Sequence, residues 1–259
     1  MELTKKALAQ AGLSVSAALD AQTAEDYLCR EIPPFGGVIV ALFPYYAGRQ
    51  PGNLSLYARG EDYHAALRRR LRRAAQLLGL EAQPFADVSP FDEVGLAAAA
   101  GLGGVGQNGL LMNRPFGSFF FIGELVTKER LAPLDGGLAP ACTGCGRCAA
   151  QCPTGALQGG RVQTARCLSH ITQARRLTDE QQALLGKSAL VWGCDLCQLC
   201  CSANEGLEAS ALPEFSKELL CSLTADELAG LSDRAFRKKY ENRAFAFRGI
   251  APLRRNLER

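Results

Sequence analysis

Four cysteines fall within eleven residues of the stretch CTGCGRCAAQCPTG, at positions 142, 145, 148 and 152. They match the pattern CxxCxxCxxxCP, in which three thiolates bind one 4Fe-4S cluster and the fourth binds another. A short loop wrapped around a cluster can present a sulfur at every third residue, with backbone amides facing the inorganic sulfides. Pro153 then turns the chain away before it continues. The run therefore predicts iron–sulfur ligation.

A second run, GCDLCQLCC, occupies residues 193–201, and a lone cysteine stands between the two runs. Two 4Fe-4S clusters need four thiolates each, and the chain can supply them. We expect one cluster to use Cys142, Cys145, Cys148 and Cys201. We expect the other to use Cys152, Cys167, Cys194 and Cys197. Cys200 is an alternative to Cys201, because it would complete the spacing CxxCxxC.

Structural zinc is the competing interpretation, since CxxC pairs also build tetrahedral zinc sites. Zinc does not need the CxxCxxCxxxCP run, whose crossed fourth ligand is typical of iron–sulfur proteins, so clusters are favoured. Three cysteines fall outside the expected ligand sets, namely Cys29, Cys200 and Cys221. We expect them to be buried as small apolar residues, which is a common environment for free cysteine.

The composition is that of a globular protein that can bury a substantial core, with 259 residues, 47% hydrophobic and 21% charged. The N-terminus lacks the apolar segment of a secretory signal, and no stretch approaches the roughly 18 apolar residues of a membrane span. Eleven cysteines suit a reducing compartment if they bind metal or do redox chemistry. We therefore expect a cytoplasmic protein with no membrane contact.

Hydrophobic patterns divide the chain into three expected parts: residues 1–135, 136–221 and 222–259. The first part alternates helix and strand patterns. Helices are expected near 3–12, 23–30, 61–80 and 92–100, and strands at 13–19, 36–45 and 118–126. A Pro/Gly-rich linker leads into the cysteine-rich part, where a hairpin is expected at 156–163 and a helix with a capping box at 178–186.

Positive charge gathers in two places. Residues 232–259 carry nine Lys/Arg against three Asp/Glu, a net charge of +6, behind a helix cap at Ser232. The helix expected at 61–80 carries the run RRRLRR. Either segment could contact phosphates, but for the helical run a solvated face is the favoured interpretation.

The glycine loop GLGGVGQNG, residues 101–109, contains the spacing GxGxxG of dinucleotide-binding sites. A helical pattern precedes this loop and an apolar run follows it, whereas the dinucleotide fingerprint follows a strand and opens a helix. A nucleotide site is therefore disfavoured. We expect the glycines to let the backbone approach a large flat ligand closely.

Asp87, in FADVSPFDE, lies among apolar residues that could raise its pKa and suit it to proton donation. The structural alternative is an Asx turn or a cap, and the local sequence alone favours it. Glu93 competes with Asp87 as an acid in the first turn of a helix. Tyr63 and His64 are further candidates for polar site groups, although a Tyr-His pair entering a helix is more often structural.

Together these motifs resemble the epoxyqueuosine reductase family, cobalamin-dependent iron–sulfur enzymes that perform the last step of queuosine synthesis in tRNA. The resemblance runs through YARGEDYH, FADVSPFDE, AGLGGVGQNGLLM, GSFFFIGE, CTGCGRCAAQCPTGAL and GCDLCQLCC. It implies an α+β fold. A mixed α/β cobalamin-binding domain related to reductive dehalogenases would precede a ferredoxin-like domain with two 4Fe-4S clusters and a short basic helical tail.

The resemblance also assigns roles to residues. It makes Cys201 the ligand and Cys200 the extra cysteine. Electrons would pass through the clusters to the cobalt of base-off cobalamin, and Asp87 would supply a proton as the substrate oxygen leaves as water. The cofactor-binding positions would be Tyr63, His64, Gly101, Gly103, Gly104, Gly106, Asn108 and Ser118.

Many family members continue into a helical-repeat domain that grips the anticodon stem, whereas this sequence ends at Arg259. The resemblance thus implies a short form, in which the basic tail and the arginine-rich helix supply phosphate contacts. Expected partners are tRNA and an electron donor such as a flavodoxin or ferredoxin. Two alternatives stay open: the same chemistry on a small molecule, and an electron-transfer or cobalamin-reducing protein that serves a partner.

Overall fold

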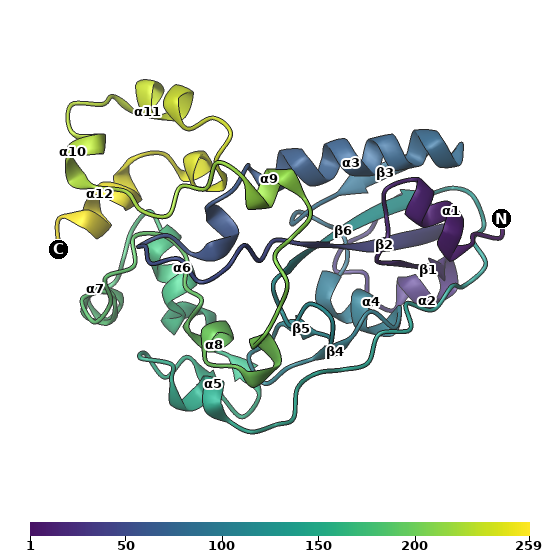
Figure 1. Ribbon diagram of the computed structural model, residues 1–259, viewed down its shortest axis with the longest axis horizontal. Coiled ribbons are helices and arrows are strands. Elements are labelled where there is room, and N and C mark those ends of the chain that lie inside the picture. Colours follow the sequence, from purple (N-terminus) through teal and green to yellow (C-terminus); the bar gives the residue numbers. More distant parts are fainter. The chain divides into compact units, whose positions relative to one another are not determined.

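The computed structural model describes all residues, 1–259, and the chain packs as two compact units (Figure 1). The first unit comprises residues 1–44, 63–106 and 110–143, and the second comprises 45–62, 107–109 and 144–259. This division differs from the expected boundaries at 135 and 221. Residues 45–62 pack with the cysteine-rich part, and the C-terminal segment belongs to the same unit.

The first unit is built on an antiparallel sheet with the strand order β1-β2-β6-β3. The strands are β1 (Ser16–Asp20), β2 (Gly37–Pro44), β6 (Phe120–Thr127) and β3 (Ala82–Phe85). The predicted strands at 36–45 and 118–126 are confirmed as the two central ones. Antiparallel pairing throughout distinguishes this sheet from the parallel sheet of dinucleotide-binding folds.

Helices cover both faces of this sheet (Figure 1). They are α1 (Lys5–Gln10), α2 (Ala21–Glu25), α3 (Tyr63–Leu78) and α4 (Glu93–Ala99). Helix α3 packs Leu67 and Leu71 against Gly123 of β6, where a Cβ would come within 3.1 Å of Leu71. On the other face Leu96 of α4 joins the buried cluster around Val40. No helix in the structure has the length and apolar character needed to cross a membrane.

The glycine loop follows α4 and forms most of a small hairpin of β4 (Gly104–Val105) and β5 (Leu111–Met112). A helix therefore precedes the loop, which contains β4 and is followed by β5, and no helix opens after it. This order confirms that the GxGxxG spacing does not form a dinucleotide fingerprint.

The second unit consists of short elements around the cysteines and a C-terminal set of helices. Its elements are η1 (Leu56–Ala58), α5 (Arg147–Ala150), β7 (Leu157–Gln158), β8 (Arg161–Val162), η2 (Thr164–Arg166), α6 (Leu168–Gln173), α7 (Asp179–Leu185), α8 (Leu196–Leu199), η3 (Ser202–Asn204), α9 (Pro213–Ser216), α10 (Ala225–Leu228), α11 (Asp233–Lys239), η4 (Ala244–Arg248) and α12 (Ala251–Leu257). The predicted hairpin at 156–163 and the capping box of Thr178 and Gln181 are both confirmed.

The C-terminal segment closes the core of the second unit. Trp192, Phe236, Phe245 and Leu253 are all fully buried and belong to one apolar cluster. Burial of such side chains stabilises the fold by about 1.5–3 kcal/mol each. The segment is therefore an integral part of the unit and not a solvated extension.

Most of the arginines in this segment have structural partners. Arg243 donates to the carbonyl oxygens of Arg59, Gly60 and Glu218 at 2.7, 2.9 and 2.8 Å. Backbone carbonyls also accept from Arg237, Arg254, Arg255 and Arg259. These guanidinium groups join separate segments of the chain, so part of their N–H groups is committed to the fold although each arginine keeps its charge.

Candidate functional site

Asp87 lies in the loop between β3 and α4 with a backbone φ of 67°. This left-handed conformation is uncommon for a residue with a Cβ, although aspartate tolerates it better than most. The backbone N–H of Asp87 donates to Oε1 of Glu93 at 3.1 Å. Glu93 thereby helps to hold the loop in a conformation that is typical of functional positions.

The carboxylate of Asp87 contacts His64 rather than the apolar residues beside it in sequence. Its Oδ2 lies 3.1 Å from Nε2 of His64, and the Asp87 side chain is 56% exposed. The hydrogen bond from His64 holds the pKa of Asp87 below its ordinary value, and partial burial only opposes this effect. The expectation that its neighbours raise the pKa of Asp87 was wrong.

His64 is positioned by stacked rings at the start of α3. The Tyr63 ring lies 4.0 Å from the His64 ring and 4.3 Å from the Phe121 ring of β6, nearly parallel to Phe121 at 6°. Stacking restricts the imidazole and directs it toward Asp87. The structure thus brings together Tyr63, His64 and Asp87, three of the residues predicted for the site.

Two further acids lie near this pair, Glu124, which is buried, and Glu93, which is half-buried. Glu124 is opposite Val40 across the sheet and therefore shares the face that α4 covers. Burial raises its pKa to about 8; its Oε2 is hydrogen-bonded to Ser89 and its Oε1 has no hydrogen-bond partner. Glu93, the first residue of α4, has its pKa raised to about 7 by burial and then by the charge of Asp87.

Sequence analysis missed Glu124 and Ser89. The available signal was a single acid within the buried strand pattern SFFFIGELV, where an ionisable residue is not expected without a partner.

The pKa values of these carboxyl groups are spread apart, which is the arrangement used by acid–base sites. At neutral pH Asp87 is ionised, whereas Glu124 retains its proton and Glu93 is close to half-protonated. The imidazole of His64 is hydrogen-bonded to the exposed carboxylate of Asp87, and an imidazole can itself carry a proton. The cluster can therefore accept, hold and deliver protons at one exposed oxygen, Asp87 Oδ2.

Close contacts within the protein explain why the loop 101–109 has glycine at two of its positions. Gly101 has φ 71°, and a Cβ there would meet Asp135 at 1.7 Å. Gly103 has φ 142°, and a Cβ there would meet the Met112 carbonyl at 2.5 Å. The lack of side chains at these positions is thus explained without a ligand, and their predicted contact with a flat cofactor stays a prediction.

The remaining predicted cofactor-binding positions are also placed. Gly104 pairs within the β4–β5 hairpin, and the N–H of Gly106 donates to Leu110. Asn108 and Ser118 are buried polar side chains.

The first cysteine run forms an open loop. Gly144 and Gly146 adopt left-handed conformations with φ 72° and 74°, on either side of Cys145, before α5 begins. Alternating backbone of this kind turns N–H groups toward one side, which suits binding of an anion or an iron–sulfur cluster. Cys142 and Cys145 are exposed.

The cysteines expected at the second cluster lie close together in the second unit. They are Cys152, Cys167, Cys194 and Cys197. Burial raises the pKa of Cys194 to about 12, and the charges of Asp195, Cys167 and Cys152 add to the shift. Burial likewise raises the pKa of Cys197 to about 12, with added effects from Cys194 and Cys167. These four thiols are therefore close enough to repel one another as thiolates, as the predicted set requires.

Cys148 lies near the end of the second run. Its charge raises the pKa of Cys200, after the larger effect of burial, and the charge of Cys201 adds to it. Both Cys200 and Cys201 are half-buried, and the contact with Cys148 is made by Cys200.

No three Cys, His, Asp or Glu side chains converge closely enough to hold a single metal ion. A cubane needs no such convergence, because each iron takes its own thiolate.

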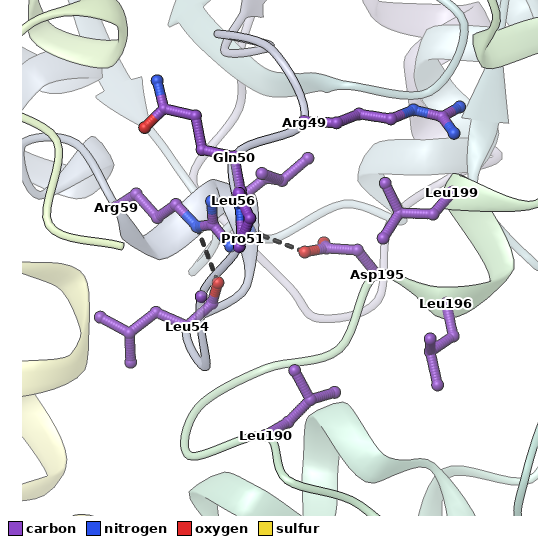
Figure 2. Close-up of a pocket in the computed structure, with 11 residues that line it drawn as sticks. Arg49, Gln50, Pro51, Leu54, Leu56, Arg59, Leu190, Asp195, Leu196 and Leu199 are labelled. Carbon is purple, nitrogen blue, oxygen red and sulfur yellow. Dashed lines mark hydrogen bonds between the residues drawn. The ribbon is translucent and has the colours of Figure 1, made fainter. Parts of the chain in front are cut away.

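Asp195 fixes the second run to the segment 45–62. It is buried and accepts hydrogen bonds from Ser55 Oγ at 2.6 Å and Leu56 N at 2.7 Å. A pocket of about 310 Å³ lies beside it, with Arg49 on its rim and Leu196 and Leu199 of α8 in its wall (Figure 2). Asp195 therefore anchors the backbone between Cys194 and Cys197 to the segment 45–62.

The expected burial of the extra cysteines was wrong. Cys29 is exposed, and Cys200 and Cys221 are half-buried. In the turn after α2 it is Leu28 that pairs with Phe91 and packs against the core, which leaves Cys29 outside.

Two family models match the chain. The model "4Fe-4S double cluster binding domain" matches residues 141–204, and "Epoxyqueuosine reductase QueG, DUF1730" matches residues 31–91. The chain is 39% identical over 218 residues to an epoxyqueuosine reductase of Lactococcus garvieae, covering 80% of this chain and 60% of that protein. It therefore spans about three fifths of the length of this relative.

The fold is similar to solved epoxyqueuosine reductases. The structure from Streptococcus thermophilus has a TM-score of 0.79 at 23% identity, over 98% of this chain and 78% of that one. A second has a TM-score of 0.78 at 23% identity and contains an epoxyqueuosine-modified stem loop of tyrosine tRNA, with 98% and 79% of the two chains covered.

The cysteine framework and its family match define an iron–sulfur protein with an acid–histidine site in its first unit. Over the region that these matches cover, the chain belongs to the epoxyqueuosine reductase family.

Proposed function

We propose that the protein is a cobalamin-dependent iron–sulfur reductase that converts epoxyqueuosine to queuosine in tRNA. The observation that carries this proposal is the hydrogen bond between Asp87 and His64, in a chain related to epoxyqueuosine reductases. In the overall reaction the epoxide C–O bonds break and a carbon–carbon double bond forms. Two electrons and two protons enter, and the oxygen leaves as water.

Two 4Fe-4S clusters would supply the electrons one at a time. The grouping of Cys152, Cys167, Cys194 and Cys197 supports one ligand set. The left-handed glycines beside Cys145 and the nearness of Cys148 to the adjacent pair Cys200 and Cys201 support the other, which would also include Cys142. The donor set therefore fits the clusters, with Cys201 as the proposed eighth ligand.

Cobalamin, when bound, would supply a reduced cobalt that delivers the electrons to the epoxide. Corrin rings carry peripheral amides, and the amide of Asn108 and the hydroxyl of Ser118 are chemically suited to them. The backbone of Gly101, Gly103, Gly104 and Gly106 and the side chains of Tyr63 and His64 are proposed to face the same cofactor. This part of the proposal rests on family membership.

Asp87 is proposed to protonate the leaving oxygen. Because its pKa is lowered, Asp87 does not hold this proton at rest, and its partner has to provide it. His64 Nε2 is in place to pass a proton to Asp87 Oδ2, from which it moves to the substrate oxygen. Glu93 keeps the Asp87 loop in the conformation that allows both contacts.

One structural observation favours a second candidate, the same reduction on a free nucleoside. Five arginines of the basic C-terminal segment donate to backbone carbonyls, so this segment offers fewer phosphate contacts than its charge suggests. A small substrate would need none of them.

The test is an anaerobic assay with reconstituted clusters, added cobalamin and a chemical reductant. The substrate is either tRNA containing epoxyqueuosine or the free epoxyqueuosine nucleoside, and the product is detected by mass spectrometry as the loss of one oxygen. The proposal expects conversion of epoxyqueuosine in tRNA. The affinity for tRNA, and with it the conversion, should fall steeply as the salt concentration rises. Conversion of the nucleoside alone supports the second candidate, and cluster reduction without conversion of either contradicts both.

A further inference from the structure

Phe247 is an exposed aromatic residue in the most basic segment of the chain. Its side chain is 51% exposed, whereas Phe245, two residues earlier, is fully buried. The guanidinium of Arg248 lies over the Phe247 ring at 4.7 Å from the centroid. The ring also meets the Trp192 ring edge-on, at 6.1 Å and 88°. The Trp192 ring and the Arg248 guanidinium thus both contact the Phe247 ring and restrict it.

The backbone under this pair is held by a charged network. Arg237 Nη1 donates to the carbonyl oxygens of Ala246 at 3.3 Å and Phe247 at 3.1 Å. Asp233 in turn accepts from Arg237 Nε at 2.7 Å and from the N–H of Ile250 at 2.9 Å. These bonds position the ring before any ligand arrives, so binding costs little conformational entropy.

The charges around the ring favour an anionic partner. Arg248 is exposed, and so are Arg234 on α11 and Arg175, which is near enough to Asp233 to help lower its pKa. Asp233 is the acid among these groups, and it is already paired with Arg237. Unlike the arginines that donate to backbone carbonyls, Arg248 is exposed and lies with its guanidinium over the Phe247 ring.

We propose that Phe247 and Arg248 form a stacking platform, which we call the Phe247 platform, for an unpaired base of the RNA substrate. This inference rests on the proposed function and specifies how RNA is held. Unpaired bases stack on aromatic rings and on guanidinium planes, and flanking arginines attract the phosphates. A protein partner would instead be expected to cover a wider apolar patch, and Phe247 is a single exposed ring.

The test compares RNA binding by the full-length, cluster-loaded wild type and by the variants Phe247→Leu and Arg248→Gln. Leucine keeps the apolar contact with Trp192 but removes the aromatic face. We expect each variant to bind the substrate stem loop about tenfold more weakly, as for the loss of one stacked base. KM for tRNA should rise similarly, with kcat unchanged at saturating tRNA.

Two features separate stacking from general attraction. Phe247→Leu should leave the salt dependence of binding unchanged because no charge is lost. Binding to a fully paired RNA duplex of equal length should not change either, since it offers no unpaired base.

The hairpin of β7 and β8 provides a matched control in the same unit. Arg161 and Val162 are an adjacent exposed arginine and apolar residue with no ring between them, so Arg161→Gln and Val162→Ala should bind RNA like the wild type. Equal iron content and equal unfolding temperature of all variants would show that the fold is retained.

Unchanged affinity in Phe247→Leu, or an equal loss in the control variants, would overturn the platform while leaving the proposed reaction intact. Absence of RNA binding by the wild type, with reduction of the free nucleoside, would instead refute the RNA substrate and the platform together.

Discussion

Nε2 of His64 lies 3.1 Å from Oδ2 of Asp87, and this hydrogen bond is the main cause of the lowered pKa of the aspartate. The carboxylate is stabilised in its charged form although it is the residue proposed to deliver a proton. A proton donor with a lowered pKa works only if its partner supplies the proton when the substrate oxygen develops charge. The pair must therefore act together.

The variant Asp87→Asn tests this role. Asparagine is nearly the same size and also tolerates a positive φ, so the loop should keep its shape. Because the amide cannot relay a proton, we expect turnover to fall by about 10²- to 10⁴-fold. Both clusters should still assemble and be reduced, as measured by iron content and electron paramagnetic resonance.

Val88→Ala serves as the control, because Val88 is 59% exposed and adjacent to Asp87. Comparable turnover in Asp87→Asn and the wild type would show that the proton comes from elsewhere.

The buried acid Glu124 predicts how stability depends on pH. Burial raises its pKa in the folded state to about 8, so between its ordinary value of 4.5 and about 8 the folded state binds more protons than the unfolded state. Stability is therefore greatest below this range and falls as the pH rises through it. We expect the free energy of unfolding to drop by roughly 3–5 kcal/mol between about pH 5 and pH 9.

Glu124→Gln should remove the share of this dependence that Glu124 contributes, including the part above the pKa of Glu93 at about 7, and be the more stable protein at about pH 9. Thermal unfolding across the pH range measures the effect, with the exposed Glu129→Gln as a control. Parallel curves for Glu124→Gln and the wild type would mean that Glu124 does not hold a proton.

Periodicity identified the main strands and helices because their buried faces repeat regularly. The apolar runs of β2 and β6 were clear in the sequence, and the capping box of Thr178 and Gln181 indicated the start of α7. The strand β3 was missed, since its residues are all partly exposed and carry no clean alternation.

The site was only partly predictable for a different reason. Asp87, Tyr63 and His64 could be proposed from the sequence, but the pKa of Asp87 depends on a contact 23 residues away in the chain. Glu124 looked like an interruption in an apolar strand. Its role follows from Ser89 and Glu93, which only the antiparallel sheet and α4 bring near it.

The two adjacent cysteines at the end of α8 allow a direct comparison. If Cys201 is the eighth ligand, Cys201→Ser should lose one cluster and about half of the bound iron and sulfide. Cys200→Ser should keep both clusters, since its thiol donates only to the Cys197 carbonyl. Iron and sulfide analysis after anaerobic reconstitution provides the measurement, and the reverse pattern would assign Cys200 as the ligand.

The arginine clamp at position 243 predicts a large effect on stability. Arg243→Lys keeps the charge but cannot span the three carbonyl oxygens that the guanidinium contacts. We expect a loss of about 2–4 kcal/mol in the free energy of unfolding.

For comparison, the exposed Arg234→Lys should change that free energy by less than about 0.5 kcal/mol. Chemical denaturation of both variants would measure the difference. Equal stability of the two would contradict a structural role for the C-terminal arginines.

The most direct test of the central claim is the mass of the modified nucleoside after anaerobic incubation of epoxyqueuosine-containing tRNA with the cluster-loaded protein, reductant and cobalamin. The account predicts conversion to a product lighter by one oxygen atom, and only when both clusters and cobalamin are present. An unchanged nucleoside in the presence of fully reduced clusters and bound cobalamin would contradict it.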